Sequence, residues 1–131
     1  MLKVLFLILI VLSPGVFAQN EDKTPIDVNP EAVKYDEFGR MNSGEVKMRF
    51  DGFMVDLQRH STAQGWIINS GAIREIARRE KLIRSYINFR KLDSSRITFV
   101  NGGYRKDQKT ELWIVPNGAA LPISIFDEET K

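Results

Sequence analysis

The sequence contains no cysteine and a single histidine, His60, among its 131 residues. Without thiolates and with one imidazole, neither a structural zinc site nor a Cys–His nucleophile pair is expected. The lack of cysteine also excludes disulfides, on which many small exported domains depend. A folded domain must therefore be held together by secondary structure and apolar packing.

Other signatures of catalysis are missing as well. The serines form no Gly-x-Ser-x-Gly elbow, and Gly102-Gly103 is typical of a turn, not of a phosphate-binding loop. His60 falls at the polar end of an expected helix, where a C-terminal cap or a solvated side chain is usual. We therefore expect no enzyme, no metal and no cofactor. Two carboxylates brought together across a cleft would be needed to support catalysis.

Residues 1–18 (MLKVLFLILIVLSPGVFA) have a charged start, a short apolar run, a Ser-Pro-Gly break and a final alanine. This pattern predicts a secretory signal peptide that is cleaved before Gln19. The alternative is an uncleaved membrane anchor, but the apolar run is shorter than the roughly 20 residues of a helical span. We expect an exported chain, periplasmic or secreted, with no stable membrane span after cleavage. Export without cysteine favours a bacterial envelope.

The remainder divides into three parts. Residues 19–32 are polar, contain two prolines and predict a flexible lead-in. Residues 33–122 have the patterns of one small folded domain, and residues 123–131 form an acidic tail. Positive and negative charges nearly balance, so the charge does not indicate a nucleic-acid partner.

Periodicity within the domain alternates between strand and helix. Strands are expected at Val33–Phe38, Trp66–Asn69, Arg96–Asn101 and Thr110–Pro116, and helices at Ser43–His60, capped by Ser43, and at about Ala72–Arg90. Such alternation predicts an α/β two-layer sandwich in which both helices pack on one face of a mixed sheet.

One arginine of the second helix conflicts with its apolar stripe. Arg79 lies at the edge of the apolar stripe formed by Ile76, Ile83 and Ile87, and we expect these three side chains to be buried. A buried guanidinium is costly unless it has partners. It could pair with a neighbouring glutamate (Glu75 or Glu80) or extend along its stem to the surface. Alternatively, it could bind the carboxylate of a ligand, for which its planar donor set is suited.

The stretch REKLIRSYINFRKLDSSRITFVNGGY (residues 79–104) resembles the second half of the OmpA-like domain, a bacterial envelope module that binds peptidoglycan. Tyr86-Ile87 stands at the family's helical Tyr-Leu, and Leu92–Ile97 at its Gly-Ile-Asp-Pro-Ser-Arg-Ile turn. Gly102–Tyr104 stands at its glycine-rich strand end. The resemblance spans about residues 35–116, is specific over 79–104, and implies a βαβαβ layout.

The resemblance also implies a ligand. Arg79 falls on the family's arginine that grips the carboxylate of a diaminopimelate-type stem peptide. The family's second strand ends in Gly-His-Thr-Asp, whereas Ile67–Gly71 contains no acid, and the usual Asn-x-x-Leu-Ser is missing. Asn69 or Ser70 could still hydrogen-bond a ligand, although neither neutralises an ammonium group.

Two functions follow as expectations. The first is a non-catalytic cell-envelope binding module of OmpA-like descent that recognises peptidoglycan or another anionic envelope ligand through Arg79, Asn69 and Ser70. The second is a structural or protein-interaction domain on the same scaffold, with a protein partner and no small ligand.

Overall fold

The computed structural model of the protein describes residues 30–120. The signal peptide expected at 1–18, most of the lead-in at 19–32 and the acidic tail at 123–131 lie outside the described residues. Within residues 30–120, neither helix has the length and apolar character that a membrane span requires.

The order of elements agrees with the order expected from periodicity. Four strands, two helices and a short 3-10 helix follow one another as β1 (Val33–Phe38), α1 (Ser43–Arg59), β2 (Gln64–Ser70), α2 (Ile73–Arg90), η1 (Ser94–Arg96), β3 (Ile97–Asn101) and β4 (Lys109–Val115). The expected strand at Arg96–Asn101 begins one residue late, because Arg96 ends η1.

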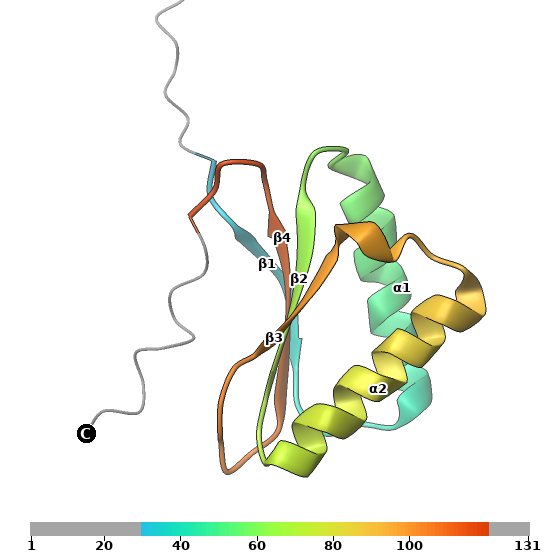
Figure 1. Ribbon diagram of the computed structural model, residues 1–131, viewed down its shortest axis with the longest axis vertical. Helices are drawn as coiled ribbons and strands as arrows, with labels where there is room; N and C mark the ends of the chain where they lie inside the picture. The colour runs from blue at the N-terminus through green and yellow to red at the C-terminus, as the bar shows by residue number, and fades with distance from the viewer. Residues whose placement is uncertain (1–29, 121–131) are drawn as a thin grey trace, which may run out of the picture.

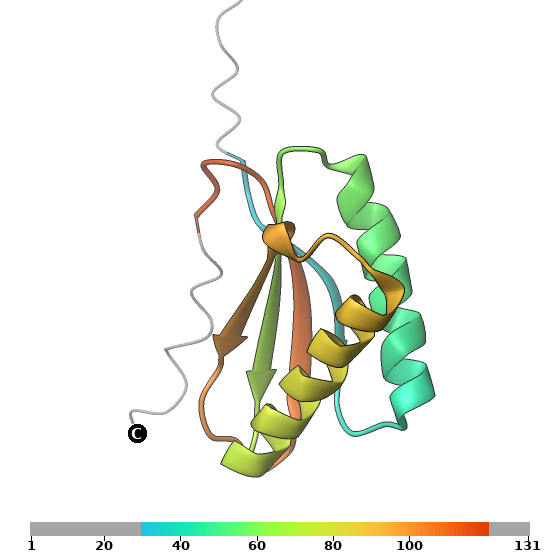
Figure 2. The ribbon, with the colours of Figure 1, turned by 45° about the vertical axis from the view of Figure 1, so that its right-hand side comes forward.

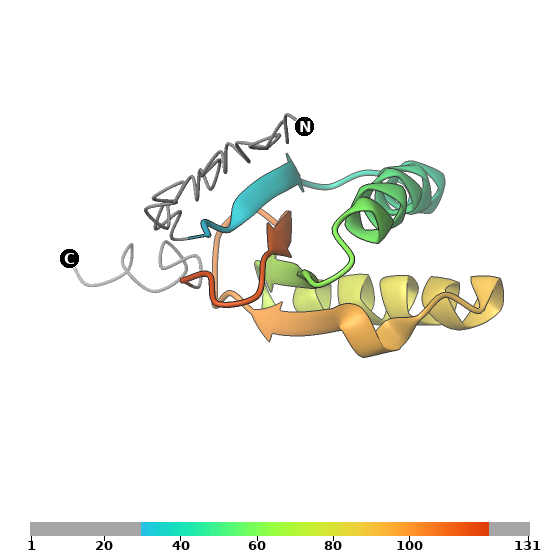
Figure 3. The ribbon, with the colours of Figure 1, turned by 90° about the horizontal axis from the view of Figure 1, so that it is seen from above.

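The strands form one mixed sheet in the order β1-β4-β2-β3. Strand β4 runs antiparallel to both β1 and β2, whereas β2 and β3 are parallel and are connected through α2. Both helices cover the same face of this sheet, as the views in Figures 1–3 show. The α/β prediction, with two helices on one face of a mixed sheet, is confirmed.

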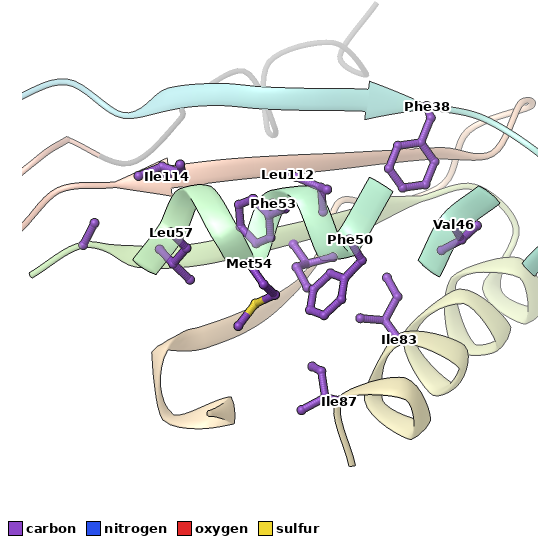
Figure 4. Close-up of a cluster of buried hydrophobic side chains, with 12 residues drawn as sticks. Phe38, Val46, Phe50, Phe53, Met54, Leu57, Ile83, Ile87, Leu112 and Ile114 are labelled. Carbon is purple, nitrogen blue, oxygen red and sulfur yellow. The ribbon is translucent and has the colours of Figure 1, made fainter. Parts of the chain in front are cut away.

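The core lies between that face of the sheet and the helices (Figure 4). Its members include the buried side chains Phe38, Phe50, Phe53, Met54, Leu57, Ile67, Ile83, Ile87, Leu112 and Ile114. Gly65 of β2 allows α1 to pack closely on the sheet. A Cβ at this position would lie 2.9 Å from side-chain atoms of Phe53, Leu57 and Ile97, so a larger residue would push α1 away.

Helix α1 is capped at both ends by side chains. The N-cap is Asn42 and not Ser43 as expected: Asn42 is extended, and its Oδ1 accepts the N–H of Glu45 at 2.9 Å. Both residue types cap well, and the chain enters the helix one residue earlier than an N-cap at Ser43 would give. At the other end, His60 is the C-cap residue, as one of the expected alternatives had it.

Arg96 closes the C-terminal end of α1 from a distant part of the chain. Its Nη2 donates to the carbonyl oxygens of Leu57 at 3.0 Å and Ala63 at 2.9 Å, and also to that of His60. These carbonyls lie at the end of the helix or just beyond it, where the negative end of its dipole favours a cation. Arg96 thereby ties η1 to α1.

Candidate ligand pocket around Arg79

Arg79 is buried on the face of α2 that packs against the sheet, with 5% of its surface exposed. Its Nη1 donates to Thr110 Oγ1 at 2.9 Å. Its Nη2 donates to the carbonyl oxygen of Gly39 at 3.1 Å and to Gln108 Oε1 at 3.2 Å. The side chain therefore connects α2 to β4 and to the segments that follow β1 and precede β4.

All of these acceptors are neutral. The pairing of Arg79 with Glu75 or Glu80 that the sequence allowed is not formed: Glu75 pairs with Arg40, and Glu80 pairs with Arg84 at 2.8 Å. Among residues 30–120, Arg79 makes no salt bridge. Its positive charge is thus buried without a directly bonded counter-ion, the arrangement that most readily accepts an anion.

The surroundings of Arg79 act on its positive charge in further ways. Burial lowers the pKa of Arg79, and the negative charge of Glu75 acts in the opposite direction. The guanidinium stays protonated at neutral pH, because arginine starts from a very high pKa. Its central carbon also lies 5.2 Å from the centre of the Phe38 ring, a cation–π contact.

A second buried polar residue joins Arg79 through Thr110. The hydroxyl of Thr110 donates to Asn69 Oδ1 at 2.8 Å. Asn69 is 2% exposed, and its Nδ2 has no hydrogen-bond partner among residues 30–120. Asn69 therefore helps to hold Arg79 through the hydroxyl of Thr110, and it is too deeply buried to contact a ligand from solvent.

Ser70 lies on the other face of the sheet. A Cβ built on Gly102 would stand 2.1 Å from Ser70 Oγ and 2.9 Å from Ile68 Cγ2, which places these two side chains on one side of β2. Successive residues of a strand point to opposite faces. The structure thus brings Asn69 to Arg79 and keeps Ser70 away from it.

A pocket of about 490 Å³ opens beside Arg79. It is lined by Arg40, Met41, Ser43, Glu75, Arg78, Arg79, Leu82 and Gln108. The sequence alone singled out Arg79 among these lining residues and did not select Arg40, Arg78 or Gln108. Arg40 and Gln108 lie in connections far from α2 in the chain, so only the fold brings them to the pocket.

The lining is positively charged overall, with three arginines and one glutamate. Glu75 Oε2 accepts the N–H of Ala72 at 3.2 Å, and its Oε1 contacts Arg40. The Ala72 hydrogen bond, followed by that from Arg40, lowers the pKa of Glu75. The pocket therefore offers an anion two exposed arginines and one buried arginine, with a charged carboxylate at its side.

The pocket does not resemble a metal centre. In the described part of the chain, no three histidine, aspartate or glutamate side chains gather to hold a metal ion. The arginines of the pocket would also repel a cation. A small organic anion matches this lining.

Comparison with protein families, with curated proteins and with solved structures finds no match to this chain.

Proposed function

We propose that this protein is a non-catalytic binding module of the bacterial cell envelope, of OmpA-like descent, that takes a carboxylate-bearing ligand in the pocket beside Arg79. The observation that carries the proposal is the buried Arg79 guanidinium, which lacks a bonded counter-ion and lines an open pocket. The stem peptide of peptidoglycan is the ligand that the resemblance over residues 79–104 supports.

Arg79 does not act as a simple two-pronged clamp. Both its Nη atoms already donate to protein acceptors, whereas Nε has no hydrogen-bond partner among residues 30–120. Three of the five N–H donors of Arg79 are used by the protein, so one on Nε and one on Nη1 remain for a ligand, together with a poorly solvated positive charge. The exposed arginines Arg40 and Arg78 provide further donors that can adjust to the carboxylate.

Glu75 supplies the acidic group that Ile67–Gly71 lacks. It projects from the first turn of α2 into the same pocket as Arg79. An amino acid carries an ammonium group next to its carboxylate, and Glu75 can accept hydrogen bonds from that ammonium. A pocket with both charges favours a zwitterionic end of a peptide over a simple anion.

A second function has one observation in its favour. Arg79 donates hydrogen bonds to Thr110, Gly39 and Gln108 without any ligand. The side chain therefore links α2 to the segments that contain these residues by itself. A structural or protein-interaction domain would need Arg79 for this purpose alone. The two functions differ in whether the exposed arginines of the pocket matter.

Retention on purified peptidoglycan sacculi tests the proposal. The chain from Gln19 onward is compared with a double variant, Arg40→Ala with Arg78→Ala, which alters the exposed wall of the pocket and leaves Arg79 in place. Arg74→Ala is the matched control, because Arg74 is exposed on the same helix but does not line the pocket. We expect the double variant to lose retention at least tenfold while the control is retained.

A native chain that sacculi do not retain would overturn the peptidoglycan assignment. Equal retention of native chain and double variant would remove the pocket from the binding site.

A further inference from the structure

Helices α1 and α2 cover one face of the sheet, and no helix or strand of residues 30–120 covers the other (Figure 3). We call this second side the outer face. Since successive residues of a strand point to opposite faces, it carries the side chains that alternate with the core. Its middle is formed by Trp66 and Ile68 of β2 and by Glu111, Trp113 and Val115 of β4.

The middle of the outer face has the properties of a covered surface. Trp66 and Trp113 lie directly opposite each other and are half-buried, and Ile68 is 0% exposed. The Trp113 Nε1–H is buried and has no hydrogen-bond partner among residues 30–120. Buried donors are paired in the great majority of cases. A segment that packs here should therefore offer both apolar side chains and a hydrogen-bond acceptor.

The described chain ends beside this face. After β4, a turn in which the Ala119 N–H donates to the Pro116 carbonyl at 3.0 Å leads to Ala120, which bridges Glu31. Seen from above, this last segment turns to the side of the sheet opposite the helices (Figure 3). Residues 121–131 therefore start next to the outer face, at the end of the sheet where β4 ends.

The sequence of residues 121–131 (LPISIFDEETK) suits an apolar surface at its beginning. Leu121, Ile123 and Ile125 occupy alternate positions, so in an extended segment they point to the same side. The lead-in at 19–29 also adjoins the described chain, but it contains two branched aliphatic residues and no aromatic one. Residues 121–131 are therefore the better apolar partner for the two tryptophans.

The length of this segment places its acidic part at the far end of the sheet. At about 3.3 Å per residue, residues 121–127 extend roughly 20 Å, as far as β4 does from Val115 back to Lys109. The acidic run Asp127–Glu129 then lies level with Lys109.

The charge at that end of the sheet is complementary to the acidic run. The connection that enters β4 carries Arg105, Lys106 and one acid, Asp107, and Lys109 follows at the start of the strand. Bases thus outnumber acids where Asp127–Glu129 arrives. Opposite charges attract across such a contact and fix its direction.

We propose that residues 121–131 dock along the outer face of the sheet, with Ile123 and Ile125 on the two tryptophans and the acidic run at the Lys109 end. A backbone carbonyl of the docked segment accepts the Trp113 Nε1–H. The segment thereby closes the side of the sheet that the helices leave open, opposite the Arg79 pocket.

Tryptophan fluorescence tests this cover, because the chain has two tryptophans and both lie on the outer face. In the chain from Gln19 onward, Ile123→Ser with Ile125→Ser removes the apolar contacts. Ser124→Ala is the matched control, since it points to the other side of an extended segment. With folding verified by circular dichroism, we expect the double variant to increase acrylamide quenching at least twofold and the control to leave it unchanged.

Paramagnetic broadening in NMR tests the path of the segment, and the absence of native cysteine allows labelling at a single site. A spin label on Glu128→Cys should broaden the backbone amides of Ser70 and Lys109, at the far end of the outer face. The amide of Lys81, exposed on α2, should stay sharp. A label on Asn20→Cys, in the lead-in, is the control and should broaden none of the three.

Equal quenching of the native chain and the double variant would overturn the proposal. So would broadening from position 20 in place of position 128, because the lead-in would then be the cover. Broadening that grows with protein concentration would also contradict it, since the segment would then belong to another copy of the chain.

Discussion

Arg79 and Asn69 are joined through a single hydroxyl group. Thr110 Oγ1 accepts from Arg79 Nη1 at 2.9 Å and donates to Asn69 Oδ1 at 2.8 Å. Because an alcohol has only one proton, donation to Asn69 leaves the oxygen of Thr110 to accept from Arg79. The buried arginine is thereby held in one orientation by the central strands of the sheet.

Thr110→Val tests this relay, because valine has a similar shape and lacks the hydroxyl. Arg79 and Asn69 would each lose a buried partner, so we expect the free energy of unfolding to fall by about 1–3 kcal/mol in urea denaturation. Thr110→Ser keeps the hydroxyl and should lose clearly less. A valine variant as stable as the native chain would contradict the relay.

Glu75 should make stability depend on pH in the acidic range. Its pKa is lowered by the Ala72 N–H and then by Arg40, from an ordinary value of 4.5. A lowered folded-state pKa stabilises the fold above the unfolded-state pKa, and this contribution is lost as the pH falls through the folded-state value. The native chain should therefore exceed Glu75→Gln in stability at neutral pH.

Denaturation of both chains between pH 7 and pH 2 measures this difference. The gap between the two unfolding free energies should narrow as the pH falls below 4.5. A gap that stays constant over the whole range would show that the Glu75 charge does not contribute.

Arg96→Ala should loosen the C-terminal end of α1. It leaves the carbonyls of Leu57, His60 and Ala63 without this donor. Hydrogen bonds to a charged group contribute about 1.5–3 kcal/mol, so we expect a loss of that order, with faster amide exchange in the last turn of α1. Arg74→Ala, an exposed change on α2, should stay within about 0.5 kcal/mol of the native chain.

The sequence predicts the order of helices and strands and places Arg79 at the edge of the apolar stripe of α2, because both depend on local periodicity; that the side chain is buried and does not extend to the surface is known only from the fold. It does not predict the partners of Arg79, since Gly39, Gln108 and Thr110 are distant in sequence and meet only in the fold. The assignment of Asn69 and Ser70 to one site shows a second limit. Both are buried, and hydrophobicity does not reveal which of two neighbouring residues faces the helices when both faces of a strand are covered.

The lining of the pocket could not be predicted from the sequence either, because its residues come together only in the fold. Arg40 was not singled out in the sequence, and its contact with Glu75 becomes visible only when the segment after β1 lies beside the start of α2. In the proposed function Glu75 takes the place of the acid that Ile67–Gly71 lacks, and it reaches the pocket from another element of the fold. A search for an aspartate at the end of β2 could not have found Glu75 on α2.

The most direct test of the central claim is titration of the isotope-labelled chain with a soluble diaminopimelate-containing stem peptide, followed by NMR. We expect saturable shifts of the Arg79 Nε–H resonance and of the Gln108 side-chain amide, with little change at Ser70 on the opposite face. An unchanged Arg79 Nε–H resonance at high peptide concentration, or shifts confined to the face that carries Ser70, would contradict the account.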